Sequence, residues 1–389
     1  DAQVCLIRLH YHLQRARRRR AKAGIDIKSV GFGTDGGHTS AQLVKHMPRN
    51  VIRGAVRADF FWGFGPNAFA RASRMRQPRD LQRPEFGVAA DHLRGHAFDA
   101  ARADVLYGKM GTAHEISGGS AANTIAGMAA LGRKCGFIGQ VADDQFGKVF
   151  SHDIRAIGVD FTTPMRGEEP PTAQCLIFVT PDGQRTMNTF LGASQYLPAK
   201  ALDKVMIERA AVLYLEGYLW DPEEPRAAMR EAIAIAKNAG RKVAFTLSDN
   251  FVISRHGDDF RALLNAGDID ILFANEGEIC TLMDTEDFEA AVAAAAPLAQ
   301  TLVVTRSEKG AIAIQNGVRA EVAAEPVDKV VDTTGAGDLF AAGFLAGQAE
   351  GRSLADSLIM GSVCAAEVIS HYGPRPEADL KALVAARLG

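Results

Sequence analysis

The chain of 389 residues has few cysteines and no long apolar run. Its cysteines are scattered without a C-x-x-C pair, which argues against a zinc site or a disulfide framework and predicts a reducing, cytoplasmic setting. No run of about 18 apolar residues occurs, so we expect no transmembrane helix and no membrane partner. None of the ten histidines has a partner at metal-ligand spacing. The five cysteines are Cys5, Cys135, Cys175, Cys280 and Cys364.

The sequence also lacks a large net charge, but the value of −2 hides an uneven distribution. Residues 1–98 hold 18 Lys and Arg against 7 Asp and Glu, whereas the remainder holds 26 against 39. The first part contains the Arg-rich run at 15–20 and shows little sustained periodicity. We therefore expect two parts: a basic segment over 1–98 that is poorly ordered or atypical, and a folded domain over 99–389.

Three interpretations of the basic segment stay open. Arg clusters allow binding to nucleic acid or to a membrane surface. The composition also suits a targeting peptide, although the apolar stretch of a secretory signal does not follow. Disorder, or an extension produced by an altered reading frame, accounts for the same pattern. We favour this last interpretation and expect no nucleic-acid partner.

From about residue 99 onward, helical and strand patterns alternate. This alternation predicts a mainly parallel sheet that is covered on both faces. Two hairpins are expected as well, one over 173–190 and one over 311–323. The predicted helices cover 100–110, 118–131, 146–157, 224–239, 258–265, 286–300, 339–350, 353–371 and 378–388. The predicted strands cover 134–138, 211–215, 242–247, 269–273 and 301–305, with a short β-like run at 325–331.

The segment Asp332–Asp338 reads D-T-T-G-A-G-D and leads into an apolar helix. Gly335 and Gly337 let the backbone turn so that successive N–H groups point outward at the positive end of that helix. With Ala336 they form an anion hole that suits a transferring phosphoryl group. Asp338 lies beside this hole and is the candidate base for an attacking hydroxyl. For an isolated motif of this kind, a helix N-cap is the alternative.

Two upstream segments, 118–124 and 139–147, favour the phosphoryl-transfer site over the simple helix N-cap. Together with 332–338, and in the same order, they resemble the signatures of the PfkB (ribokinase-like) family of carbohydrate and nucleoside kinases. The resemblance runs from about Asp99 to the C-terminus. It implies an α/β fold, a ribokinase-like three-layer α/β/α sandwich with a mainly parallel sheet and a small β-lid. The hairpin near 173–190 is then part of the lid.

The resemblance also implies an acceptor site. Gly118, Gly119 and Asn123 would contact the acceptor's hydroxyls, because two glycines admit a sugar ring and an amide both donates and accepts. Arg185, at the exit of the lid hairpin, would reach the transferring phosphate or pin the lid. Asp338 keeps the role of base.

A magnesium site is implied where Asn275 and Glu278 match the family's N-x-x-E motif. Their hard oxygens suit Mg²⁺ bound through water, with nucleotide phosphates completing the coordination. An acidic loop without a metal is the alternative interpretation of this segment.

A nucleotide site is implied by the T-x-x-x-x-G element that follows another apolar strand. Thr305, Ser307 and Gly310 would contact the nucleotide, and Ala366 on a late helix would wall the adenine. The expected cofactors are therefore ATP and Mg²⁺, and the resemblance leaves room for a monovalent cation.

Within the family, the segments 185–193, 243–250 and 268–276 look more like adenosine kinases than like ribokinase or fructokinase. We predict ATP-dependent phosphorylation of a primary hydroxyl, with adenosine converted to AMP as the first choice and a sugar such as ribose or fructose as the second. The expected partner is a small molecule, and both a monomer and a homodimer stay open.

One departure from the family favours a different class of protein. Family members carry an aspartate at the end of their first strand that binds acceptor hydroxyls, and nothing in residues 60–67 supplies it. No first strand is recognised before Asp99 either. A catalytically weak, nucleotide-binding relative is therefore the alternative to an active kinase.

Overall fold

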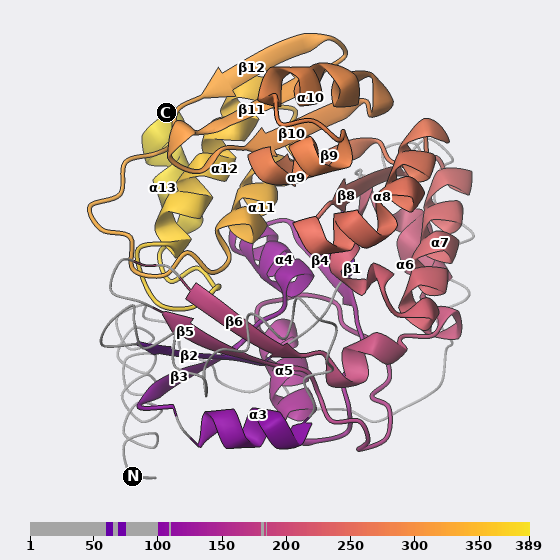
Figure 1. The fold of residues 1–389 in the computed structure, drawn as a ribbon, viewed down its shortest axis with the longest axis vertical. Helices are drawn as coiled ribbons and strands as arrows, with labels where there is room; N and C mark the ends of the chain where they lie inside the picture. Colours follow the sequence, from indigo (N-terminus) through magenta and orange to yellow (C-terminus); the bar gives the residue numbers. More distant parts are fainter. Residues whose placement is uncertain (1–59, 65–68, 75–99, 109, 180–182, 184) are drawn as a thin grey trace, which may run out of the picture. The chain divides into compact units, whose positions relative to one another are not determined.

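Strands and helices alternate along most of the chain that the structure, a computed structural model, describes (Figure 1). The described residues are 60–64, 69–74, 100–108, 110–179, 183 and 185–389. All of them belong to one unit, residues 57–389. None of the described helices combines the length and apolar character that a membrane span requires.

The strands form two sheets, and their bounds match most of the predicted ones. They are β1 Phe60–Phe64, β2 Phe69–Arg74, β3 Ala113–Ser117, β4 Lys134–Ile138, β5 Gln174–Val179, β6 Arg185–Phe190, β7 Val212–Glu216, β8 Lys242–Thr246, β9 Ile271–Asn275, β10 Thr301–Thr305, β11 Ala311–Gln315 and β12 Val318–Val322.

The helices connect these strands and cover the sheets. They are α3 Ala100–Tyr107, α4 Ser120–Ala130, α5 Gln145–Ala156, α6 Lys204–Arg209, α7 Glu223–Asn238, α8 Asn250–Asn265, α9 Glu276–Leu282, α10 Phe288–Ala295, α11 Ala336–Ala349, α12 Leu354–Val368 and α13 Leu380–Leu388.

The large sheet has eight strands in the order β12-β11-β10-β9-β8-β7-β1-β4. The six strands from β10 to β4 pair in parallel, whereas β11 and β12 are added as an antiparallel hairpin at one edge. Because the strands are parallel, their carboxyl ends lie at the same edge of the sheet, which is where ligands bind in open α/β folds.

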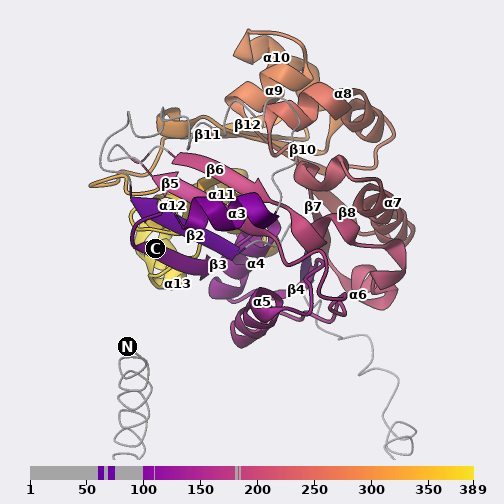
Figure 2. The same cartoon turned by 60° about the horizontal axis from the view of Figure 1, so that its bottom comes forward.

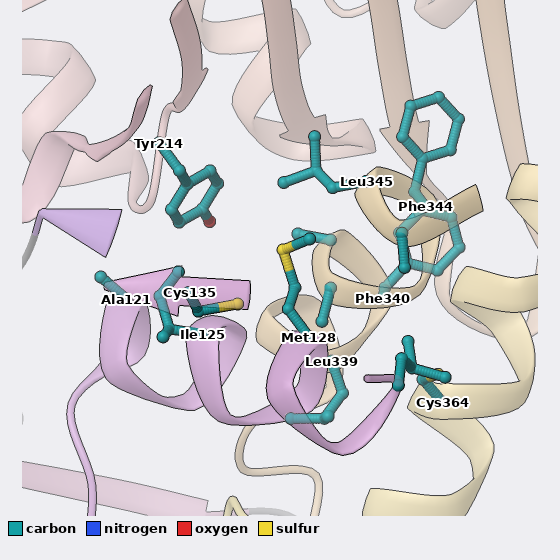
Figure 3. Close-up of a cluster of buried hydrophobic side chains, with 14 of the residues drawn as sticks. Ala121, Ile125, Met128, Cys135, Tyr214, Leu339, Phe340, Phe344, Leu345 and Cys364 are labelled. Atoms are coloured by element: carbon teal, nitrogen blue, oxygen red, sulfur yellow. The ribbon is translucent and has the colours of Figure 1, made fainter. Parts of the chain in front are cut away.

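Alternate residues of the central strands point to opposite faces of this sheet, and each face carries its own core. Val212 and Tyr214 of β7 join the core formed with α4, α5, α11, α12 and α13. Leu213 and Leu215 of the same strand join the core formed with α6 to α10. Figure 3 shows part of the first core, with Ala121 and Ile125 of α4 below Tyr214 and residues of α11 beside them. These two helix layers and the sheet are the predicted α/β/α sandwich.

The second sheet is small, with four strands in the order β3-β2-β5-β6. The hairpin β5–β6 is antiparallel, as predicted, and β2 pairs in parallel with β5. Helix α3 packs on one face of it through Ala103 and Leu106, next to Leu176 and Phe178. Figure 2 brings this sheet and α3 to the front. It is the small β-lid of the predicted fold class, which is thereby confirmed.

The prediction that no strand precedes Asp99 is wrong for two segments. Strand β1 lies in the large sheet between β4 and β7, and β2 lies in the small sheet between β3 and β5. A single run of five or six residues has too few periods to distinguish a strand from a helix, so only pairing reveals it. The rest of the basic segment, including the Arg-rich run at 15–20, lies outside the described residues.

Candidate active site

The segment that leads into α11 is a shaped loop and not the predicted β-like run. No strand forms over 325–331, and the Val331 N–H donates instead to the carbonyl of Ile369 at 2.8 Å. The buried Asp332 organises the turn, since its Oδ1 accepts from the Thr334 N–H at 3.0 Å and from the Thr334 hydroxyl at 2.6 Å. Its Oδ2 accepts from the Gly373 N–H at 3.2 Å. The loop is therefore fixed by the chain that follows α12.

Gly335 is the residue that requires glycine in this loop. It precedes the first residue of α11 with φ of 83°, a left-handed conformation that costs an L-residue energy. A Cβ at this position would also lie 2.9 Å from the Cα of Pro374. Gly337, by contrast, is helical and exposed, and a Cβ there would meet nothing within 4 Å. The predicted backbone reversal thus belongs to Gly335 alone.

The first turn of α11 presents the features of an anion site. Helix α11 is 14 residues long and begins at Ala336, so its positive dipole end lies at Gly335 to Gly337. Within this turn the Ala336 N–H donates to the Thr333 carbonyl at 3.4 Å. The space beside Gly337 is open. The three predicted anion-hole residues are therefore brought together at one helix terminus.

Asp338 lies in the same first turn, and both of its oxygens are hydrogen-bonded. Its Oδ1 accepts from the Ser120 hydroxyl at 2.7 Å, and its Oδ2 accepts from the Asn123 amide at 2.8 Å. Burial raises the pKa of Asp338, whereas these two hydrogen bonds and the charges of Arg185 and Arg375 oppose the rise. Asp338 is thus an acid with neutral donors on both oxygens and cations nearby, a suitable setting for a base.

Glu216 is a member of this cluster that the sequence analysis missed. It ends strand β7, is fully buried, and its Oε1 lies 2.6 Å from the Ser120 Oγ, within hydrogen-bond distance. Burial and the nearby Asp338 raise the pKa of Glu216 well above its ordinary value. A charged residue at the carboxyl end of an apolar strand is the signal that could have pointed to it.

The predicted acceptor residues lie at the start of α4. Gly119 precedes this helix with φ of 98°, and Gly118 beside it is buried. Asn123 is buried and holds Asp338 through Nδ2, while its Oδ1 has no hydrogen-bond partner among the described residues. The glycine turn and the candidate base are thus joined through α4, and the Asn123 amide is already engaged.

Two arginines approach the site from different elements. Arg185, at the start of β6, donates to the Thr333 hydroxyl, which in turn donates to the Gly183 carbonyl at 3.4 Å. The lid hairpin therefore contacts residues 332–335, the loop before α11, which we call the anion loop. Arg375, which the sequence analysis did not select, donates from Nε to the Ser117 carbonyl at the end of β3 at 3.1 Å. Burial lowers the pKa of Arg375 to about 10.

Asn275 and Glu278, the candidate magnesium residues, form a reciprocal cap at the start of α9. The Glu278 N–H donates to Asn275 Oδ1 at 2.8 Å, and the Asn275 N–H donates to Glu278 Oε2 at 3.0 Å. A third bond runs from Asn275 Nδ2 to Glu278 Oε1 at 2.7 Å. Burial raises the pKa of Glu278 to about 7. A capped helix, and not an acidic loop, is therefore the local structure here.

The predicted nucleotide residues lie at the carboxyl end of β10 and after it. Thr305 ends the strand, and Ser307 follows with φ of 51°, an unusual value for a residue other than glycine. Gly310 has φ of 91°, and a Cβ there would lie 2.0 Å from the Val322 carbonyl oxygen. Ala366 is half-buried on α12. No hydrogen bond between the side chains of these residues and the Asp338 cluster occurs within the described residues.

Tyr218 lies two positions after Glu216, in the short helical turn Gly217–Trp220 that follows β7, and its side chain is exposed. No group of three or more His, Cys, Asp or Glu suited to a metal ion occurs in the described part of the chain.

Known proteins resemble this chain in sequence and in fold. A model of the pfkB family carbohydrate kinases matches residues 95–380. A fructokinase from Klebsiella pneumoniae is 28% identical over 273 residues, which cover 68% of this chain and 89% of the relative. The same fold occurs in solved complexes with ATP, one of which also holds Mg²⁺.

Two solved structures are closer in sequence, and each is covered almost completely. A probable sugar kinase from Rhizobium etli CFN 42 is 42% identical with a TM-score of 0.79, and the match covers 85% of this chain and 98% of that one. An adenosine kinase from Sinorhizobium meliloti is 42% identical with a TM-score of 0.78, covering 85% and 99%. The sandwich, the anion loop before α11 and the family match over 286 residues lead to one conclusion: this chain belongs to the pfkB family of carbohydrate kinases.

Proposed function

We propose that this chain transfers the terminal phosphoryl group of ATP to the primary hydroxyl of adenosine, forming AMP. Kinases of this family are ATP-dependent phosphotransferases that act on sugars or nucleosides. The observation that carries the reaction type is the position of Asp338 in the first turn of α11, beside the N–H groups of Gly335, Ala336 and Gly337. Adenosine is placed first because the segments 185–193, 243–250 and 268–276 resemble adenosine kinases, and an adenosine kinase from Sinorhizobium meliloti is among the solved structures at 42% identity.

Asp338 acts as the general base in this proposal. It takes the proton of the acceptor's hydroxyl as the oxygen attacks phosphorus, so the nucleophile carries its negative charge only in the transition state. The anion hole holds the equatorial oxygens of the transferring group with backbone N–H donors that need no reorganisation. Arg185 adds a positive charge from the lid side, where it already contacts Thr333.

The acceptor lies against the start of α4. Gly118 and Gly119 admit its ring to the backbone, and Asn123 holds Asp338 with its N–H group. The Asn123 Oδ1, which has no partner among the described residues, is then the acceptor for a substrate hydroxyl. Closing the lid hairpin over this position would exclude water from the reacting atoms.

The nucleotide is assigned to the region after β10, with Thr305, Ser307, Gly310 and Ala366 as its contacts. Mg²⁺ would neutralise the charge that develops on the phosphates. Asn275 and Glu278 would hold it through water, with the second lone pairs of oxygens that already accept hydrogen bonds in the cap of α9. This donor set fits a hydrated Mg²⁺, which keeps several of its waters.

A sugar acceptor is the second candidate, because the probable sugar kinase from Rhizobium etli CFN 42 is as similar as the adenosine kinase. A catalytically weak nucleotide binder is the third. The sequence that follows β1, Gly65-Pro66-Asn67, carries no aspartate to bind acceptor hydroxyls.

A coupled ADP-release assay with the full chain separates these candidates. Adenosine, other nucleosides, ribose and fructose are each supplied with ATP and Mg²⁺. We expect the highest kcat/KM with adenosine. A higher value with a sugar would transfer the proposal to the sugar kinases, and ATP binding without turnover of any acceptor would support the weak binder. Cytoplasmic localisation and a monomeric or homodimeric state remain predictions.

A further inference from the structure

One hydroxyl group lies between two carboxyl groups at the centre of the site. The Ser120 Oγ is 2.6 Å from Glu216 Oε1 and 2.7 Å from Asp338 Oδ1. Both distances are short, as expected for hydrogen bonds in which a carboxyl group takes part. Because a serine hydroxyl has one hydrogen, it can donate to only one of the two.

The other carboxyl group must therefore donate to Ser120, which requires that it carries a proton. Two ionised carboxylates would leave one short contact between lone pairs, and they would repel each other across a single oxygen atom. If both acids were ionised, as is usual at neutral pH, the row Glu216, Ser120 and Asp338 would lack one proton. The geometry thus requires one additional proton, which the members of this row share.

The surroundings decide which acid carries this proton. Asp338 accepts a second hydrogen bond from Asn123 and lies in the field of Arg185 and Arg375, all of which favour its ionised form. Glu216 is fully buried, and its Oε2 has no hydrogen-bond partner in the described part of the chain.

The remaining neighbours of Glu216 do not reverse this assignment. The Tyr214 hydroxyl and the Ala121 N–H lie close enough to favour its ionised form, but burial and Asp338 act more strongly in the opposite direction. Tyr218 is the other titratable group of the described residues near it. Glu216 is therefore the acid that stays neutral.

We propose that Glu216 is a positioning residue that remains protonated and, by donating to Ser120, makes Ser120 donate to Asp338. This inference rests on the proposed function, because it assumes that Asp338 is the base. The row fixes the Asp338 carboxylate from one side while Asn123 fixes it from the other. It also keeps a second negative charge away from the phosphoryl group, since the only ionised carboxylate in the row is the base itself.

The test uses two substitutions at Glu216 in the full chain. Glu216→Gln keeps a neutral donor for Ser120, so we expect kcat to fall by no more than about threefold and the acid limb of kcat against pH to stay in place. Glu216→Leu removes the donor, so kcat should fall about tenfold to a hundredfold with little change in KM for ATP. Ser120→Ala should lower kcat by a similar factor. The double variant Ser120→Ala/Glu216→Leu should lower kcat little further, because both changes break the same row of hydrogen bonds.

A structural role alone would not produce this pattern. The proposal is overturned if Glu216→Gln loses as much activity as Glu216→Leu, or if its acid limb moves to lower pH, because a lost negative charge would lower the pKa of Asp338. An infrared difference spectrum at pH 7 gives a readout without turnover: the carbonyl band of a protonated carboxylic acid should be present and should disappear in Glu216→Gln. If no acceptor is phosphorylated, the proposed function fails, while this band still decides where the proton lies.

Discussion

The proposed acceptor side and the proposed nucleotide side of the candidate site are built by different kinds of contact. On the acceptor side, Ser120 bonds to Glu216 across 96 positions and to Asp338 across 218 positions of sequence. On the nucleotide side, Asn275 and Glu278 bond to each other across three positions. Three elements meet in the first cluster, whereas the second lies at the start of a single helix.

This difference predicts different responses to substitution. A long-range cluster depends on the packing of α4, α11 and β7, so each change there should alter the chemistry of the base. A local cap stabilises its own helix, so a change there should act mainly on that helix and on what binds beside it. The following experiments test this contrast.

The largest effect is expected from Asp338→Asn. The amide keeps the shape of the side chain but cannot accept the acceptor's proton, so kcat should fall by about 10² to 10⁴. Binding of ATP, measured by isothermal titration, should change little because the anion hole is backbone. A variant that retains most of its kcat would remove Asp338 from the role of base.

The acid limb of the kcat profile tests the electrostatics of the same cluster. Asp338 is active when ionised, and burial raises its pKa, so activity should be lost as pH falls through a value above the ordinary one of about 3.9. Below that pKa, kcat should fall about tenfold per pH unit. Arg185→Ala removes a charge that lowers this pKa, so its acid limb should move to higher pH. An acid limb at the ordinary value would contradict the burial of the base.

The two glycines of the anion loop should separate folding from turnover. Gly337→Val places a side chain in the open space beside the first turn of α11, so it should impair turnover while circular dichroism stays unchanged. Gly335→Ala must adopt a left-handed conformation against Pro374, so it should also lower the free energy of unfolding by about 1 to 2 kcal/mol. Normal kinetics of a folded Gly337→Val protein would mean that this turn only begins a helix.

The smallest effect is expected from Asn275→Ala on the nucleotide side. Loss of the helix cap should lower the free energy of unfolding by about 1 kcal/mol, measured by urea denaturation. We expect KM for ATP to rise while kcat at saturating ATP stays close to that of the unchanged protein. Thr285→Ala is the matched control, since Thr285 lies in the half-buried chain after α9, where its hydroxyl accepts one hydrogen bond, from the Asp287 N–H at 3.2 Å. A large loss of kcat in Asn275→Ala would show that the two sides are not independent.

Most elements of the large sheet were predictable because their signals are local. The apolar runs at 134–138 and 301–305 became β4 and β10 at the predicted bounds, and the alternation with helices implied parallel pairing. Strands β1 and β2 were missed since short segments in a basic context acquire their structure only by pairing with β4, β7, β3 and β5.

The site shows the same division. The glycine turn, Asp338, Asn275 and Glu278 were selected from their motifs, and the spacing of the last two also makes them a cap. Ser120, Glu216 and Arg375 were not found, because nothing in their neighbouring sequence indicates that they approach Asp338. The sequence predicted a backbone turn at both Gly335 and Gly337, but of these two only Gly335 has a positive φ.

The sequence by itself determined the family and most of the order of helices and strands, and it named Asp338 as the candidate base. These follow from motifs and periodicities that each extend over less than about 20 residues. Only the tertiary structure decided that one serine hydroxyl joins two carboxyl groups, and hence that one of them must carry a proton. The physical reason is that a pKa depends on burial and on charges within a few ångströms. Those neighbours come from segments that only folding brings together.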